Sequence, residues 1–186
     1  MSELIVFDFD FTIAKTIEHM WVWSPRGSFT YNNKTYRKVH PTQLQQSGIL
    51  DDEEINNDSF QEFYNLNITK TQIIQPLLPY LVYYTSKQKI HILTARPQSI
   101  ENDALRFLQN YQINTSNIQF TGLTNSYIEK KIEWINNQIL TNNLNKLVLF
   151  EDNIKLINYM LENCIINKSL YYINNYTNKT VITHYE

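Results

Sequence analysis

The stretch LIVFDFDFT, residues 4–12, sets the interpretation of the whole sequence. Four consecutive apolar residues, a pattern typical of a strand buried on both faces, lead directly into two aspartates spaced two residues apart. Because strand side chains alternate with a period of two, Asp8 and Asp10 are expected on one side of the strand end. Burying a carboxylate without a partner is costly. Something must therefore compensate the charge of Asp8 and Asp10.

Four more short apolar blocks follow, separated by stretches with a helical pattern. The expected strands are residues 4–7, 89–95, 117–123, 146–151 and 169–174, and the expected helices are residues 70–86, 99–111, 126–140 and 154–163. Strands that alternate with helices are typical of a parallel sheet with helices on both faces. We therefore predict one α/β domain of the Rossmann-like class over residues 1–186, with residues 169–174 as an edge strand.

A segment from about residue 17 to residue 67 breaks this alternation. The aromatic blocks HMWVW, SFTY and TYRKV alternate like strands and are joined by SPRGS and NNK, which predicts a β-hairpin or a small meander. The acidic residues 48–64 that follow are weakly helical at best. We interpret the segment as a cap insertion over the carboxyl ends of the strands, where open α/β sheets bind their ligands.

The composition restricts the partners and the location. A formal charge of −2 over 186 residues gives no overall attraction to nucleic acid or to a membrane surface. No apolar run is long enough to span a bilayer, and no positively charged segment precedes one. We therefore expect a soluble cytoplasmic protein without a membrane partner.

Two other predicted strands also end in polar side chains. KIHILTAR ends in Thr94 and Arg96, and KLVLFEDN ends in an acidic pair. Carboxylates that converge from two strands repel each other strongly where the effective dielectric constant is low. A divalent cation resolves this repulsion, and oxygen ligands with few imidazoles favour Mg²⁺ over zinc. The candidate ligands of this magnesium ion are Asp8, Asp10, Glu151 and Asp152.

Taken in order, these motifs resemble the four motifs of the haloacid dehalogenase (HAD) superfamily. They are the aspartate pair in DFDFT, Thr94 after an apolar strand, a lysine in the helix SYIEKKIEW, and the pair Glu151-Asp152 after another apolar strand. The resemblance extends from residue 4 to about residue 163. The most similar types are phage and viral HAD phosphatases and the phosphatase part of polynucleotide kinase-phosphatases. It implies a HAD fold and a magnesium-dependent phosphatase.

The resemblance also implies roles for individual residues. Asp8 would be the nucleophile that forms an aspartyl-phosphate. Asp10 would be the general acid toward the leaving alcohol and then the general base for water. In this superfamily, an aspartate two residues after the nucleophile is associated with phosphoester hydrolysis rather than dehalogenation. Thr94 and the helical lysine would bind the phosphoryl oxygens.

The chain departs from the family pattern at two positions, the lysine of the third motif and Phe11. Lys130 and Lys131 compete for the third motif, and Lys131 is preferred because the apolar residues Trp134 and Ile135 suit a lysine that projects from a packed helix face. The family often has Gly or Asp where this chain has Phe11, so the turn that follows the strand is expected to differ.

The substrate is predicted from the insertion, which interleaves aromatic and basic residues: Trp21, Trp23, Arg26, Phe29, Tyr31, Lys34, Tyr36, Arg37, Lys38 and His40. This pattern suits base stacking and phosphate contacts, and it would make the cover of the site locally positive. The alternative is a small β-element whose aromatic residues pack on the main domain. The leading substrate class is a nucleotide or a nucleic-acid end phosphate. The candidate substrate-binding residues are Thr12, Arg26, Arg37, Arg96 and Lys130, although Thr12 also suits a turn and Arg96 a helix start.

Other function classes fit the sequence less well. A receiver domain would carry its phosphoacceptor aspartate on the strand KIHILTAR, which has none. The three glycines form no phosphate-binding loop. A HAD-like module that binds a phosphorylated ligand or a protein partner without turnover remains the main alternative, but such a module has little need of both Asp8 and Asp10.

Overall fold

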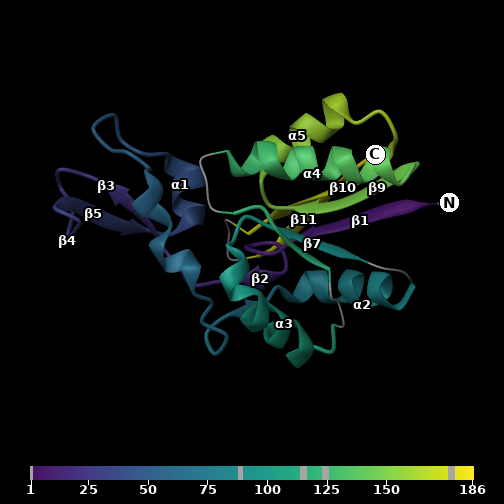
Figure 1. The fold of residues 1–186 in the computed structure, drawn as a ribbon, viewed down its shortest axis with the longest axis horizontal. Helices are drawn as coiled ribbons and strands as arrows, with labels where there is room; N and C mark the ends of the chain where they lie inside the picture. The colour runs from purple at the N-terminus through teal and green to yellow at the C-terminus, as the bar shows by residue number, and fades with distance from the viewer. Residues whose placement is uncertain (1, 88–89, 114–116, 123–125, 176–178) are drawn as a thin grey trace.

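The computed structural model describes residues 2–87, 90–113, 117–122, 126–175 and 179–186, and it is built around a six-stranded sheet in the order β11-β10-β9-β1-β7-β8 (Figure 1). The strands of this central sheet are β1 (Glu3–Asp8), β7 (His91–Thr94), β8 (Ile118–Phe120), β9 (Lys146–Glu151), β10 (Asn167–Asn174) and β11 (Val181–Tyr185). All neighbours pair in parallel except β10 and β11. The predicted α/β class with a mostly parallel sheet is confirmed.

Helices cover both faces of this sheet, α4 and α5 above it and α2 and α3 below it in Figure 1. Their bounds are α2 (Leu78–Lys87), α3 (Glu101–Asn110), α4 (Tyr127–Thr141) and α5 (Ile154–Asn163). The residues of β1 alternate between the two layers. Ile5 and Phe7 pack in the core cluster below the sheet, whereas Leu4 and Val6 pack in the cluster above it. Asp8 continues the alternation of Leu4 and Val6, so it faces α4.

The order of the strands creates a topological switch point between β1 and β9, where the chain changes the direction in which it adds strands to the sheet. From β1 the chain proceeds outward to β7 and β8, returns through α4 to β9 on the other side of β1, and then continues outward to β10. Open α/β sheets bind ligands outside the carboxyl ends of their strands at such a point. The carboxyl ends of β1 and β9 carry Asp8 and the pair Glu151-Asp152.

The helix expected at residues 70–86 begins later than predicted. The short strand β6 (Gln72–Ile73) and a 3₁₀ turn (Gln75–Leu77) precede α2. Pro76 explains the difference, because proline lacks an N–H group and disfavours helical backbone at the residue before it. Lys89 and Leu123, at the ends of two predicted strands, lie outside the described residues.

The strand at residues 169–174 was expected at an edge, and this was wrong because β11 pairs with its outer side. A ladder of stacked rings supports this pairing: Phe7, Phe150, Tyr171 and His184 sit in register on four adjacent strands. Their ring centroids are 4.2, 4.3 and 4.4 Å apart, and the ring planes are nearly parallel, with interplanar angles of 3°, 6° and 9°. Cross-strand aromatic pairs of this kind stabilise a sheet, so they favour the addition of β11 despite its exposed surface.

The insertion forms a separate three-stranded sheet in the order β3-β5-β4. Its elements are β3 (Met20–Trp23), β4 (Phe29–Tyr31), β5 (Lys34–Val39), α1 (Pro41–Ser47) and the 3₁₀ helix η1 (Asn57–Tyr64). The expected hairpin is β4–β5, whose two-residue turn has positive φ at both positions, Asn32 and Asn33. A meander is wrong, since β5 lies between β3 and β4. Gly27 permits this crossing, because a Cβ there would lie 2.5 Å from the backbone nitrogen of Tyr36.

Two antiparallel segments connect the insertion to the central domain, namely β2 (Ala14–Lys15) and β6. In Figure 1 the N-terminus, where β1 begins, lies at the right, and the insertion lies at the left, beyond the other end of the strands.

Within the described part of the chain, every helix is too short or too polar to cross a membrane.

Candidate active site

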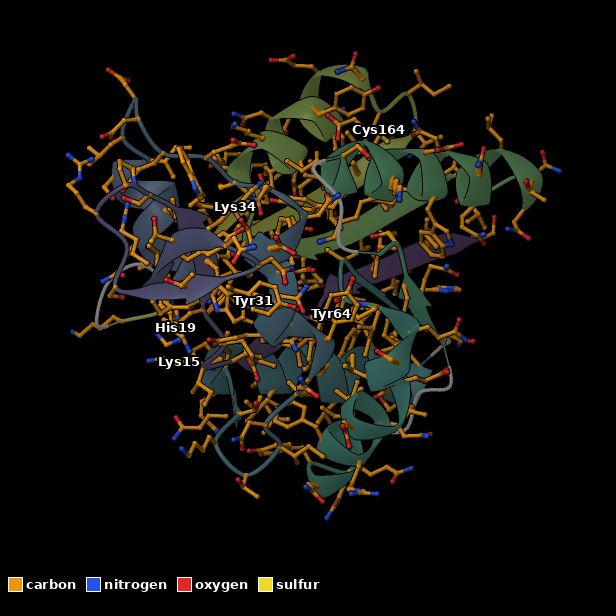
Figure 2. The ribbon with its side chains drawn as sticks, turned by 60° about the vertical axis from the view of Figure 1, so that its left-hand side comes forward. Lys15, His19, Tyr31, Lys34, Tyr64 and Cys164 are labelled. Carbon is orange, nitrogen blue, oxygen red and sulfur yellow. The ribbon has the colours of Figure 1, made fainter. Side chains whose placement is uncertain are left out.

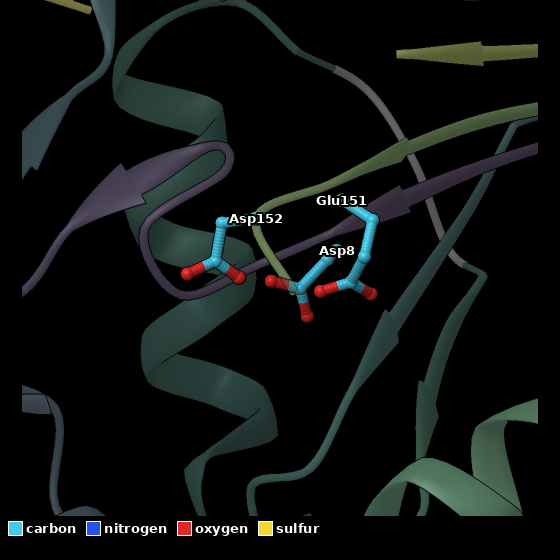
Figure 3. Close-up of side chains that lie close together, drawn as sticks. All are labelled: Asp8, Glu151 and Asp152. Atoms are coloured by element: carbon cyan, nitrogen blue, oxygen red, sulfur yellow. The ribbon is translucent and has the colours of Figure 1, made fainter. Parts of the chain in front are cut away.

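A cluster of three buried carboxylates lies at the switch point between β1 and β9. Asp8 ends β1, Glu151 ends β9, and Asp152 follows directly. One carboxylate oxygen from each lies within 4.8 Å of the others, and the three residues are only 2–6% exposed (Figure 3). The three side chains therefore share one small site, which we call the carboxylate cluster.

The carboxylate cluster is bridged by Lys131 of α4. Lys131 projects from the same helix face as Ile135 and Ile139, which pack on the sheet at intervals of four residues. Its Nζ donates hydrogen bonds to Asp8 Oδ1 at 2.6 Å and to Glu151 Oε2 at 2.9 Å. Burial alone would lower the pKa of Lys131, but the two carboxylates outweigh it and raise this pKa, so the ammonium stays charged.

The neighbouring Lys130 points elsewhere. It is exposed, and its Nζ lies 3.4 Å from the carbonyl oxygen of Thr121. Of the two adjacent lysines, the structure brings only Lys131 to Asp8.

The electrostatics of the carboxylate cluster are unbalanced. Three carboxylates facing one ammonium carry a formal charge of −2. Burial and the neighbouring negative charge of Glu151 raise the pKa of Asp8, and burial and the charge of Asp8 raise the pKa of Asp152. A divalent cation would compensate this charge, and an all-oxygen donor set of this kind suits Mg²⁺. Glu151 is held in orientation by the backbone N–H of Asn153, which donates to its Oε1 at 3.1 Å.

Asp10 lies beside this cluster but its carboxylate is not part of it. Since β1 ends at Asp8, the alternation expected from the sequence does not extend to Asp10. Its carboxylate accepts hydrogen bonds from Arg96 Nε at 3.0 Å and from the hydroxyl of Thr16 at 3.0 Å. After burial and Glu151, the charge of Asp10 also contributes to the raised pKa of Asp8, which places the two aspartates near each other.

The turn after Asp10 is held from two sides. Phe11 has a φ of 59°, a region that L side chains rarely adopt, which gives a physical reason why Gly or Asp would suit this position. Its ring contacts that of His40 in the insertion at 5.0 Å, and its carbonyl oxygen accepts a hydrogen bond from Asn175 Nδ2. Thr12 is fully buried in this turn, and among the described residues its hydroxyl has no hydrogen-bond partner.

Two further candidates lie at the carboxyl end of β7, the strand next to β1. Thr94 is buried, and its hydroxyl accepts a hydrogen bond from the backbone N–H of Arg96 at 3.1 Å. Arg96 is completely buried and binds Asp10 and Glu18 through its guanidinium. Arg96 therefore points into the protein rather than toward solvent.

The two arginines of the insertion are paired within the insertion itself. Arg26 contacts Asp52 at 2.6 Å, and Arg37 binds Glu53 through two hydrogen bonds of 2.7 and 2.6 Å. Over residues 17–67 the sequence has four basic and seven acidic residues, so the expected positive cover is wrong. The prediction of a positive cover considered the basic residues of the aromatic blocks but not the acidic residues elsewhere in the insertion that neutralise them.

Sequence reasoning missed Tyr127 and Glu18. Tyr127 lies one helical turn before Lys131 on α4, its hydroxyl accepts a hydrogen bond from Asn153 Nδ2 at 2.9 Å, and burial raises its pKa to about 12. The spacing of four residues from Lys131 was a usable signal. No local signal marks Glu18, since its partner Arg96 is 78 residues away.

Comparisons with family models, with curated proteins and with solved structures find no match to this chain.

Proposed function

We propose that this protein is a magnesium-dependent phosphomonoester hydrolase of the HAD type that acts through an aspartyl-phosphate. One observation carries the proposal. Asp8 ends the central strand at the switch point, where it is bound by the buried Lys131 and faces the acidic pair Glu151-Asp152. The order of these residues along the chain is that of the HAD motifs.

The first half of the reaction uses Asp8 as nucleophile. One of its carboxylate oxygens attacks the phosphorus atom, the bond from phosphorus to the ester oxygen breaks, and its electron pair leaves with that oxygen, which takes a proton from Asp10. Lys131, which is 2.6 Å from Asp8 Oδ1, orients the nucleophile and adds positive charge beside the phosphoryl oxygens. A Mg²⁺ ion held by Asp8 and Asp152, with Glu151 beside them, would neutralise charge on the phosphoryl group.

The second half releases phosphate. Water attacks the phosphorus atom of the aspartyl-phosphate, Asp10 accepts the proton, and the carboxylate of Asp8 is restored as inorganic phosphate leaves. Asp10 suits these proton transfers because its side chain is 18% exposed, in contrast to the enclosed Asp8 at 6%. Thr94 at the end of β7 and the buried hydroxyl of Thr12 are the remaining candidates for contacts with the phosphoryl oxygens.

The substrate is proposed to be a nucleotide or a nucleic-acid end phosphate. The insertion offers the partly buried rings of Trp21 and Phe29, with Lys38 Nζ within about 6 Å of both. Figure 2 shows Tyr31 and Lys34, which pair across β4 and β5, on the surface of the insertion. Aromatic rings beside lysines suit base stacking. Because the insertion is acidic overall, a nucleotide is favoured over a long polyanion.

The experiment that tests the function is hydrolysis of p-nitrophenyl phosphate with and without Mg²⁺, followed by a panel of nucleoside monophosphates, end-phosphorylated oligonucleotides and sugar phosphates. We expect magnesium-dependent turnover that stops reversibly with a chelator. Asp8→Asn should reduce turnover by about 10⁴-fold or more while the protein remains folded, since the nucleophile is lost. Near-normal turnover in Asp8→Asn would contradict the assignment.

One observation favours the alternative of a non-catalytic phosphate-binding module, namely the hydrogen bonds that hold Asp10 to Arg96 and Thr16. In that case the protein would bind inorganic phosphate in the presence of Mg²⁺ but would hydrolyse none of the esters. Turnover that is abolished in Asp10→Ala would exclude this alternative.

A further inference from the structure

Arg96 is the largest side chain that is completely buried in the described residues, and its guanidinium is fully engaged. Nε donates to Asp10, Nη2 donates to Asp10 Oδ1 at 2.8 Å and to Glu18 Oε2 at 3.0 Å, and Nη1 donates to the carbonyl oxygens of Asn65 at 2.7 Å and Phe63 at 3.4 Å. Every N–H group of the guanidinium therefore has a protein acceptor. The candidate role as a direct phosphate ligand is not supported by this geometry.

The partners of Arg96 come from three separate parts of the chain. Asp10 belongs to the turn directly after the nucleophile. Glu18 lies where the insertion begins, and Phe63 and Asn65 lie where it ends. Arg96, at the end of β7, thus joins the catalytic turn to both junctions of the insertion.

Glu18 completes this connection. It is 6% exposed, and besides Arg96 it binds the backbone N–H of Asn67, which its Oε1 accepts at 3.1 Å. A buried carboxylate held by a buried guanidinium is costly to disrupt, because either partner alone would be an uncompensated charge. Burial on its own would lower the pKa of Arg96, but the charges of Asp10 and Glu18 raise it, so the guanidinium remains charged.

We infer that Arg96 is a positioning residue that makes the placement of Asp10 depend on the seating of the insertion. The inference rests on the proposed function, in which Asp10 is the general acid and base. One guanidinium is shared by Asp10 and the junction residue Glu18, so a shift of the insertion junctions moves the group that orients Asp10. A displacement of about 1 Å in a catalytic group is enough to reduce a rate by about 100-fold.

The test changes the insertion side of the contact and leaves Asp8, Asp10 and Arg96 intact. Glu18→Ala removes one partner of Arg96, Glu18→Gln keeps an oxygen acceptor, and Glu53→Ala is the matched control. Glu53 is also a buried glutamate of the insertion bound to an arginine, but its partner Arg37 lies on β5 within the insertion rather than at the end of β7. Each protein is assayed with an alkyl phosphate and with p-nitrophenyl phosphate at saturating Mg²⁺.

Protonation of the leaving group matters for an alkoxide and little for p-nitrophenolate, which leaves readily without a proton. We expect Glu18→Ala to lower kcat/KM, which reports the steps up to departure of the leaving group, by about tenfold or more for the alkyl phosphate but by less than about threefold for p-nitrophenyl phosphate. Glu18→Gln should restore most of the loss, and Glu53→Ala should change kcat/KM by the same factor for both substrates. An equal loss on both substrates in Glu18→Ala, or no loss, would overturn the inference.

Hydrogen exchange gives a second measurement that does not need activity. Glu18→Ala should increase amide exchange in residues 10–14 as well as in residues 63–67, whereas Glu53→Ala should leave residues 10–14 unchanged. If the unaltered protein hydrolyses neither phosphate, the proposed function fails, and exchange alone decides whether Arg96 couples the two regions. Unchanged exchange at residues 10–14 in Glu18→Ala would contradict the coupling.

Discussion

The carboxylate cluster and the insertion both contain buried or half-buried acidic side chains, but they balance charge differently. In the insertion each of two acids has its own cation: Glu53 binds Arg37, and Glu62 binds Lys38 at 2.5 Å. In the carboxylate cluster the ammonium of Lys131 contacts both Asp8 and Glu151, and Asp152 lies beside them.

The pKa values follow this difference. Hydrogen bonds from Arg37 lower the pKa of Glu53 to about 2, and although burial would raise the pKa of Glu62, bonds from Lys38 and Trp21 hold it at about 2. In the cluster the pKa values of Asp8 and Asp152 rise instead. The ionised forms of Glu53 and Glu62 are thus stabilised, whereas those of Asp8 and Asp152 are destabilised, a contrast that fits our proposal that the cluster binds a cation.

The adjacent residues Lys130 and Lys131 test this contrast most strongly. In chelator, Lys131→Met should destabilise the fold by about 3–5 kcal/mol, because Asp8 and Glu151 would lose the ammonium that is bonded to both of them. Lys130→Met should change the free energy of unfolding by about 0.5 kcal/mol or less, since Lys130 is exposed. Urea denaturation measures both values. Similar effects of the two substitutions would mean that the buried ammonium does not balance the cluster.

The pairing of Glu53 with Arg37 predicts a dependence on pH. The folded pKa of Glu53, about 2, lies below its ordinary value of 4.5, so the ionised pair contributes stability above pH 4.5 that is lost as the pH falls toward 2. Glu53→Gln should therefore cost about 2 kcal/mol at pH 7 and about half as much at pH 3. Thermal unfolding of both proteins from pH 7 to pH 3 measures this. A difference that stays constant with pH would contradict the assigned charge state.

A smaller effect is expected at Phe11, where the turn beside the site meets the insertion. Phe11→Gly relieves a positive φ, worth about 1 kcal/mol, but it removes a ring that is 5% exposed, which costs about 2 kcal/mol. The net loss should be about 1 kcal/mol in the free energy of unfolding. Asn32→Gly is the control, because Asn32 also has a positive φ but is exposed, and it should be neutral or slightly stabilising. A gain in stability at Phe11→Gly would show that the ring contributes little.

Those parts of the fold that follow from local pattern were predictable. The apolar runs that end in Asp8 and Glu151 locate β1 and β9, and the alternation with helices gives the parallel sheet. The preference for Lys131 came from the apolar residues of its helix face. These features depend on neighbours in the sequence, which is why periodicity reveals them.

The features that were missed depend on distant partners. Arg96 could be placed at a strand end, but its contacts with Asp10 and Glu18 span 86 and 78 residues. The acids that neutralise Arg26 and Arg37 lie 26 and 16 residues away, so the insertion appeared positive from its aromatic and basic blocks alone. β11 joins the sheet through Tyr171 and its partners across strands, which its own short sequence does not indicate.

Magnesium binding to the unaltered protein and to Asp152→Asn is the most direct test of the carboxylate cluster, with Asp52→Asn in the exposed pair with Arg26 as the control. Each protein is unfolded thermally in chelator and in Mg²⁺. At a Mg²⁺ concentration about 100 times Kd, the unaltered protein and Asp52→Asn should gain about 2.7 kcal/mol, and Asp152→Asn should lose most of that gain. No stabilisation of the unaltered protein by Mg²⁺, or an equal gain in all three, would contradict a cation site formed by Asp8, Glu151 and Asp152.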